Sequence, residues 1–293
     1  MKKILTIILV CILVIAFGVM IFFLVMNYSG SGSQTPSPDE KTVCIDDFSF
    51  DSIDFHQHLD TTPSLAIDIV LHLPVANPDI PVSAVLRRNI IADVLGQKYL
   101  CGDAPESIKA YVGELNSSFR SSMDEMDFSP SDLNDEGISY MYSWEESLRS
   151  SIFIASSQIL VTKTTFYSYT GGAHGFGGDN YCVYSLLNGK RLSLGDVFLS
   201  DSSSRADVSK FLHSALRSLI ANDEDYRDME VFSWDDVKPV ENFYVSSKGI
   251  TFVYLPYDIA AYCYGQISLT LPFAAVQPYL IPESPVYKYF SNN

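Results

Sequence analysis

Residues 159–187 read ILVTKTTFYSYTGGAHGFGGDNYCVYSLL, two β-rich stretches joined by the turn Tyr169-Thr170-Gly171-Gly172-Ala173-His174-Gly175. Three glycines and one alanine leave this seven-residue turn little side-chain bulk. Glycine adopts positive φ readily and lets other backbone come close. The pattern predicts strands over residues 159–167 and 179–187 with a compact turn between them. The turn meets a need either for tight packing or for a partner that approaches the main chain.

The segments outside this hairpin alternate between blocks of strands and blocks of helices. Alternating apolar residues predict an antiparallel pair over 48–59 and 65–73. Further strands are expected over 138–142, 152–154, 243–245, 250–254 and 265–271. Apolar stripes at helical spacing predict helices over 81–99, 103–123 and 204–220, and a short helical turn over 273–279. Asp103 and Glu106 form a capping-box-like start. Blocks of this kind indicate an α+β fold with mainly antiparallel sheets.

The amino-terminal segment predicts a membrane anchor. Lys2 and Lys3 precede residues 4–26, an uncharged run of 23 residues, which as a helix would span about 35 Å. We expect residues 1–26 to stay as an uncleaved anchor, with a cleaved signal and a secreted product as the alternative. The two lysines favour a cytoplasmic start with everything after Met26 outside. Residues 27–40, rich in Gly, Ser and Pro, predict a flexible tether, and no cytoplasmic domain is expected.

The remaining chain predicts two α+β modules, 41–166 and 167–293, with an acidic surface. The net charge is −16, which argues against nucleic acid, because binding it requires lysines and arginines that neutralise phosphates. An acidic ectodomain attracts basic proteins, although the charge also serves solubility alone.

Four cysteines follow the apolar run: Cys44, Cys101, Cys182 and Cys263. An even number outside the cytoplasm permits disulfides. We expect Cys44–Cys101 and Cys182–Cys263, one bridge in each half, with four buried free thiols as the alternative. The spacing lacks the Cys-x-x-Cys pairs typical of zinc sites.

Several motifs of the second half occur in a familiar order. These are the glycine turn, YSLLNGK at 184–190, LSLGDVF at 192–198, GITFVYLPYDIA at 249–260, Tyr264-Gly265 and Leu271-Pro272. Over residues 167–280 this order resembles the bacterial domain-of-unknown-function family 3298, which includes RsiV-like lysozyme-sensing ectodomains. Residues 48–169 are similar in texture to the companion family 4163. The resemblance implies an extracytoplasmic module in the bacterial cell envelope that recognises a lysozyme-like protein or cell-wall glycan (peptidoglycan).

The candidate binding residues are those of the glycine turn together with Tyr257 and Asp258. His174 could contact a glycan or partner, or could fix the turn by bonding neighbouring backbone. The alternative function is a cell-envelope hydrolase in which His174 works with Asp179 or Asp258. A third hypothesis is a scaffold whose partner lies in the membrane. The many tyrosines of the second half suit a protein or sugar surface, or ordinary packing of a sheet.

No metal site or cofactor is expected. His56, His58 and a facing His72 could bind a transition metal, but three exposed histidines on solvated strands explain the pattern more simply. The sequence lacks phosphate-loop, dinucleotide, HExxH and GxSxG motifs.

Overall fold

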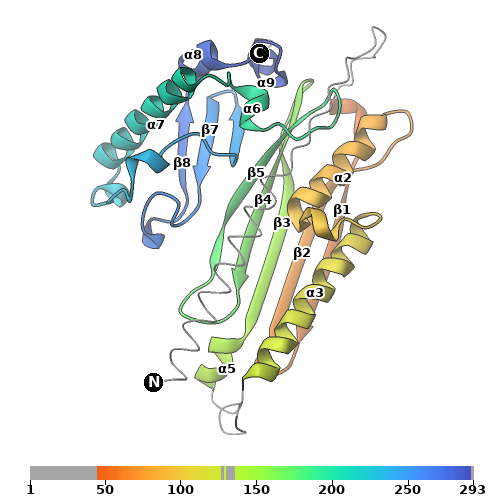
Figure 1. Ribbon diagram of the computed structural model, residues 1–293. Helices are drawn as coiled ribbons and strands as arrows, with labels where there is room; N and C mark the ends of the chain where they lie inside the picture. The colour runs from red at the N-terminus through yellow and green to blue at the C-terminus, as the bar shows by residue number, and fades with distance from the viewer. Residues whose placement is uncertain (1–44, 127–128, 130–135, 292–293) are drawn as a thin grey trace.

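The computed structural model describes residues 45–126, 129 and 136–291, which form a five-stranded and a three-stranded β-sheet with helices packed against them (Figure 1). The expected anchor, the expected tether and Cys44 lie outside the described residues. Within the part of the chain that is described, no helix combines the length and the apolar character that a membrane crossing needs.

The five-stranded sheet follows chain order, β1-β2-β3-β4-β5. Its neighbours pair antiparallel except β2 and β3, which run parallel. The sheet is therefore mixed but mainly antiparallel, in agreement with the expected α+β class, and its one parallel pair arises because helices intervene between β2 and β3 and carry the chain back. A short 3-10 helix, Ile45–Asp47, precedes the sheet. The strands are β1 (Phe50–Leu59), β2 (Leu65–Pro74), β3 (Trp144–Ala155), β4 (Ile159–Tyr169) and β5 (Phe176–Ser185).

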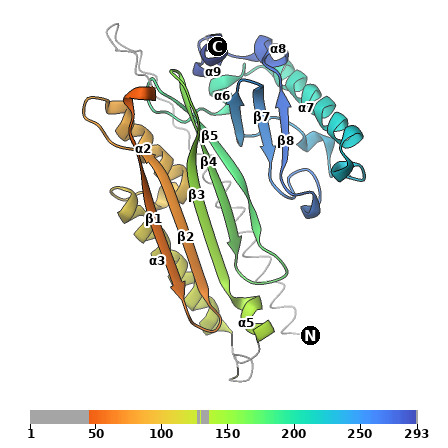
Figure 2. The same ribbon diagram turned by 180° about the vertical axis from the view of Figure 1, so that it is seen from behind.

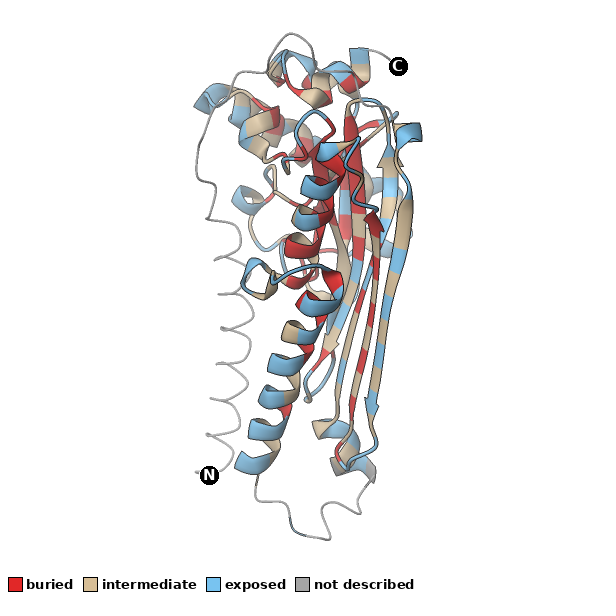
Figure 3. Ribbon diagram, turned by 90° about the vertical axis from the view of Figure 1, so that its right-hand side faces the viewer, coloured by how far each residue is buried: buried red, intermediate tan, exposed pale blue. Residues whose placement is uncertain are grey.

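Helices α2 (Pro81–Leu95) and α3 (Ala104–Glu125) cover one face of this sheet, and Figure 3 shows their buried residues on the side toward the strands. Helix α2 ends before its C-cap residue Gly96, where φ is +99°. A separate 3-10 turn, η2 (Gln97–Tyr99), replaces the predicted last turn of this helix. The expected capping box of Asp103 and Glu106 begins α3. No helix of the described residues covers the opposite face of β1 and β2 (Figure 2).

The predicted strand 138–142 is wrong, because this segment forms α5 (Glu136–Tyr142). Its aromatic composition favours a strand, but the backbone N–H of Ser143 donates to Ser139 O at 3.1 Å, as in a helix. The next predicted strand, 152–154, is only the end of the twelve-residue β3. Most of β3 escapes the sequence pattern because polar residues, Glu146 and Ser150, also occupy the inward face that Leu148 shares, so apolar and polar residues do not alternate.

The second unit consists of a three-stranded antiparallel sheet, β6-β7-β8, with α7 (Ser202–Asn222) packed against it. Its strands are β6 (Phe243–Ser246), β7 (Gly249–Tyr254) and β8 (Ile267–Leu271), which confirms the three strands expected here. The shorter elements are α6 (Leu194–Val197), η3 (Glu224–Tyr226), η4 (Trp234–Asp236), η5 (Tyr262–Tyr264), α8 (Phe273–Val276), η6 (Gln277–Tyr279) and α9 (Pro285–Ser291).

The two units share one hydrophobic core. Ile159, Val161 and Tyr181 on β4 and β5 pack with residues of the second sheet, whereas Leu160 and Cys182, on the opposite face, pack with α2 and α3. The expected module boundary between 166 and 167 falls inside β4, so it is not a boundary between the sheets. The first sheet ends with β5.

Two side-chain amides join the second unit to the backbone of β5. The Asn242 amide accepts from Tyr181 N–H at 2.8 Å and donates to Asp179 O at 3.0 Å. Gln266 Oε1 accepts from Asp179 N–H at 2.6 Å. Because Asn242 is only 5% exposed, these bonds satisfy an edge strand that would otherwise carry unpaired backbone groups.

Arg87 links the elements around the hydrophobic core that lies between the first sheet and helices α2 and α3. Its guanidinium forms a bidentate pair with Asp103, at 2.7 and 3.0 Å, and a further bond to Asp51 Oδ1 at 2.8 Å. It also donates to Pro74 O at 3.1 Å. Arg87 is 8% exposed, so one buried side chain connects α2 with the N-cap of α3 and with strands β1 and β2.

Candidate functional site

The glycine turn joins β4 to β5 and lies against α5. Gly171 and Gly172 have φ of +92° and +97°. Gly172 N–H donates to Met141 O at 3.1 Å, and Tyr169 Oη donates to Gly172 O at 2.9 Å. A Cβ on Gly171 would stand 2.6 Å from Met141 O, whereas one on Gly172 would meet no atom within 4 Å. Tight intramolecular packing therefore explains the requirement for glycine at 171, and backbone conformation alone explains it at 172.

This difference gives a matched pair of variants. Gly171→Ala combines a positive φ with a clash against backbone, and we expect it to lower the free energy of unfolding by about 3 kcal/mol. Gly172→Ala meets only the positive φ and should cost about 1 kcal/mol. Urea unfolding of both full-length variants measures the gap. Equal losses would show that Met141 does not limit the space at 171.

His174 lies at the surface, between the two units. Its ring stacks on Tyr262 with centroids 4.1 Å apart, and its Nδ1 lies 3.0 Å from Gly175 O. Tyr262 Oη donates to the same carbonyl at 2.8 Å. Tyr257 completes the group, with its Oη 3.4 Å from His174 Nε2. The fold thus brings Tyr257 to the glycine turn, as the candidate set predicted, and His174 also bonds its own turn.

Tyr257 has an unusual backbone. Its φ is +73°, and no other non-glycine residue in the described part of the chain has a positive φ. Its side chain is nevertheless 51% exposed. A large residue in the left-handed region is strained, and such strain is concentrated at functional sites. Burial of the ring does not compensate for this strain, which makes Tyr257 the strongest single pointer to a functional surface.

A groove of about 450 Å³ lies beside this aromatic group. Gly177, Gly178 and Gly265 form part of its wall. An added Cβ would stand 2.7 Å from Phe166 O at 177 and 2.7 Å from Leu255 Cδ2 at 178, so internal packing explains these two glycines, whereas one at 265 would meet no atom within 4 Å and the main chain there is open to a ligand. Tyr262 supplies a ring, and Thr165, Asp179 and Gln266 supply polar atoms. Grooves that combine a ring with a few placed polar groups are typical of ligand sites.

The two carboxylates considered for hydrolysis bind other groups. Asp179 pairs with Lys163 at 2.9 Å and accepts from Thr165 Oγ1 at 2.7 Å. Asp258 accepts from Leu255 N–H at 2.7 Å, and burial raises the pKa of its carboxyl group. His174, for its part, bonds to Tyr257 Oη and to the main-chain carbonyl of Gly175. The arrangement that the hydrolase hypothesis requires is not assembled around it.

Large exposed apolar side chains gather around the turn. Five lie on the strands that flank the turn, on α5 and on the loop of the second unit: Tyr140, Met141, Tyr167, Phe176 and Tyr257. We call these five residues, with His174 and Tyr262, the aromatic surface. Sequence reasoning missed Tyr140, Met141 and Phe176, because nothing in their local patterns distinguishes them from core residues. Several tyrosines of the second half, among them Tyr169 of the candidate binding set, are buried and do not belong to this surface. They also include Tyr181, Tyr184 and Tyr254.

The expected bridge between Cys182 and Cys263 is wrong. Cys182 is a buried free thiol on β5, and burial raises its pKa to about 11. Cys263 is an exposed free thiol in η5, beside the groove. Cys182 lies on the face of β5 that packs with α2 and α3. Cys263 belongs to the second unit, which packs against the other face of the first sheet. Cys101 is exposed, and its expected partner Cys44 lies outside the described residues.

The three histidines of β1 and β2 share a sheet face but do not converge. His56 faces Asp68 and pairs with it. His58 pairs with Asp60 at 2.9 Å, and His72 lies opposite Ser52, four residues along the strand from His56. Among residues 45–126, 129 and 136–291, no three His, Cys, Asp or Glu side chains are grouped as metal ligands.

These features define a two-sheet α+β protein with an exposed aromatic surface where a hairpin turn meets a loop of the second unit. Residues 195–274 match the family described as "Protein of unknown function (DUF3298)", which confirms the family resemblance predicted from the motifs. No curated protein matches the chain.

Two solved structures of DUF3298 family proteins are similar to the chain. A member from Bacteroides fragilis is 25% identical, with a TM-score of 0.73 over 84% of this chain and 98% of its own. A Pseudomonas aeruginosa protein is 18% identical, with a TM-score of 0.55 over 80% and 95%, and shows likeness of fold alone. The resemblance to family 4163 and to RsiV-like ectodomains stays a prediction.

Proposed function

We propose that this protein is a membrane-anchored extracytoplasmic binding module of the bacterial cell envelope, and that it recognises its ligand through the aromatic surface. The single observation that carries the proposal is Tyr257, a strained and exposed ring held against His174. Rings in such positions supply contact area at low entropic cost. The engagement of Asp179 and Asp258 elsewhere favours binding over hydrolysis.

A cell-wall glycan is the ligand that suits the local geometry best. Sugar rings present apolar faces that stack on aromatic side chains and hydroxyl groups that need hydrogen-bond partners. Tyr257, Tyr262 and His174 offer the rings, and the adjoining groove offers Thr165, Asp179 and Gln266. A site with both features next to each other fits a saccharide fragment.

A lysozyme-like protein is the second candidate, and charge favours it. The chain carries a net charge of −16. An acidic side chain acts on one tyrosine of the site, since burial and the nearby charge of Glu145 both raise the pKa of Tyr167. A basic protein would be drawn to such a surface.

The test compares binding of the full-length chain and of Tyr257→Gly to soluble peptidoglycan fragments and to lysozyme. Glycine accepts φ of +73°, so we expect unfolding free energy to stay within about 1 kcal/mol of the parent. Affinity for the true ligand should fall about tenfold or more.

Leu187→Ala is the matched control, because it removes another exposed apolar side chain beyond the opposite end of β5. It should leave binding unchanged. Undiminished binding by Tyr257→Gly would contradict the site, and failure of the parent chain to bind either probe would contradict the proposed ligands.

A further inference from the structure

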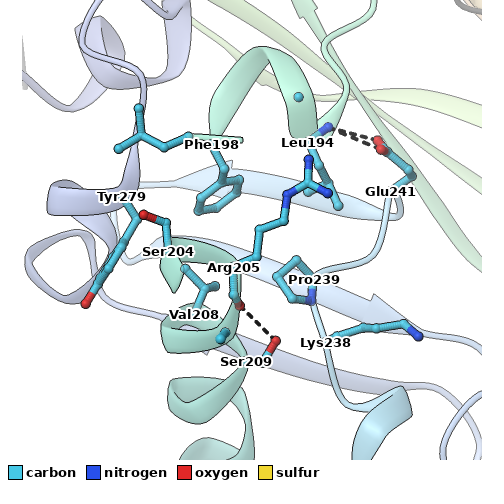
Figure 4. A pocket seen from close by; sticks show the side chains of 13 residues that line it. Leu194, Phe198, Ser204, Arg205, Val208, Ser209, Lys238, Pro239, Glu241 and Tyr279 are labelled. Atoms are coloured by element: carbon cyan, nitrogen blue, oxygen red, sulfur yellow. Dashed lines mark hydrogen bonds between the residues drawn. The ribbon is translucent and has the colours of Figure 1, made fainter. Parts of the chain in front are cut away.

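A second cavity, of about 420 Å³, lies within the three-stranded unit, between α6, the start of α7, the segment 238–241 and Tyr279 (Figure 4). Its lining includes Leu194, Phe198, Val208 and Tyr279, which give it apolar walls. Phe198 and Val208 belong to the shared core and are almost fully buried. The walls are therefore fixed by packing, and the cavity is large enough for a small organic molecule.

The charged side chains of this cavity are not balanced among themselves. Glu241 is occupied, since its two carboxylate oxygens accept Leu194 N–H at 3.3 and 3.1 Å. The guanidinium of Arg205 extends from α7 toward the end of the cavity where Leu194 and Glu241 lie (Figure 4). It forms no hydrogen bond or ion pair with any residue that the structure describes, although Glu241 contributes a longer-range attraction.

Lys238 adds a second positive charge to the cavity lining. Its carbonyl accepts Tyr254 Oη at 2.8 Å, which fixes the backbone at this position. Its ammonium is 3.7 Å from Asp236 Oδ1, a loose contact of two exposed groups. The cavity lining thus carries two exposed cations, Arg205 and Lys238, and one carboxylate, Glu241, and among the described residues the Arg205 guanidinium has no directly bonded protein partner.

From this arrangement we propose that the cavity binds a small amphipathic carboxylate, a molecule with an apolar or aromatic body and one carboxylate group. The body would lie against Phe198, Val208 and Tyr279. The carboxylate would accept the two parallel N–H groups of the Arg205 fork, a geometry that a planar carboxylate matches. Lys238 would add a second, point-like attraction. This site is separate from the aromatic surface and does not depend on the proposed function.

The test uses 4-(trifluoromethyl)benzoate and its neutral amide as probes, with ¹⁹F NMR titration of the full-length chain in nanodiscs of zwitterionic lipid. The benzoate should bind, and the amide should bind about tenfold more weakly. Arg205→Gln should reduce benzoate binding by a similar factor while leaving the amide unaffected.

Lys210→Gln is the matched control, since it removes one exposed positive charge from the same helix, where Lys210 already pairs with Asp207 at 2.8 Å. It should bind benzoate as the parent does. Equal benzoate binding by Arg205→Gln and the parent, or absence of binding to the parent at millimolar probe, would overturn the proposal. Thermal unfolding of each variant confirms that a loss of binding is not a loss of fold.

Discussion

Arg87→Met should lower the free energy of unfolding by roughly 3 kcal/mol, the lower end of the range for breaking a buried ion pair. The guanidinium is almost fully buried, and its loss leaves Asp103 and Asp51 without their partner. Pro74 O also loses its donor. The effect stays at the low end because the two carboxylates remain in contact with water. Urea unfolding of the full-length chain measures it.

Arg149→Met is the matched control. Arg149 pairs with Asp68 on the open face of the first sheet, and its side chain is 56% exposed, so its loss should cost at most about 1 kcal/mol. Losses of the same size in both variants would show that burial of Arg87 contributes nothing.

The same pair predicts a pH dependence. Arg87 holds the pKa of the Asp103 carboxyl below its ordinary value of 3.8. A carboxyl with a lowered folded-state pKa stabilises the fold above the unfolded-state pKa and loses that contribution as the pH falls through the folded value. Below pH 3.8 the parent should therefore lose stability more steeply than Arg87→Met. Parallel acid titrations of unfolding would contradict this role.

Gly249→Ala should be the most damaging single-methyl change in the second unit, at about 3–5 kcal/mol. Gly249 begins β7 with φ of +136°, and a Cβ there would stand 2.0 Å from Leu271 O. That carbonyl belongs to β8, where Leu271 pairs with Ile250. The backbones must separate to make room, so hydrogen exchange should show β6, β7 and β8 losing protection together.

Two other glycines distinguish the cost of backbone strain from the cost of a steric clash. Gly265 has φ of +63° and ψ of −149°, a region that essentially only glycine adopts, and no atom lies within 4 Å of an added Cβ, so Gly265→Ala should cost about 2 kcal/mol from backbone strain alone. Gly113 lies inside α3 with the same open space, and Gly113→Ala should stabilise by about 0.5–1 kcal/mol. A Gly249→Ala loss no larger than that of Gly265→Ala would contradict the clash.

The sequence could predict those parts of the fold that depend on short-range patterns. The alternation of Leu65, Ile67 and Ile69 predicted β2, and the Asp103–Glu106 capping box predicted the start of α3. The parallel pairing of β2 and β3 could not be predicted, since it depends on helices that bring back a strand remote in sequence. The residues of α5 show that a short-range pattern can also mislead. Their aromatic composition favours a strand, but they form a helix in the connection that leads into β3.

The candidate site was predictable only in part. The glycine turn and Tyr257 could be selected for their composition and their place in a family motif. Their contact through His174 could not, because it joins residues 83 positions apart. Asn242 and Gln266 carried no signal at all, since a side-chain amide that substitutes for a strand partner has no local sequence pattern.

Hydrogen-exchange mass spectrometry of the full-length chain with bound ligand tests the central claim most directly, that the aromatic surface is where the protein binds. Whichever of the peptidoglycan fragment and lysozyme binds, protection should increase in residues 167–178 and 255–266. It should not change in α2 or α3. Protection confined to the open face of β1 and β2, with residues 167–178 and 255–266 unchanged, would contradict the account.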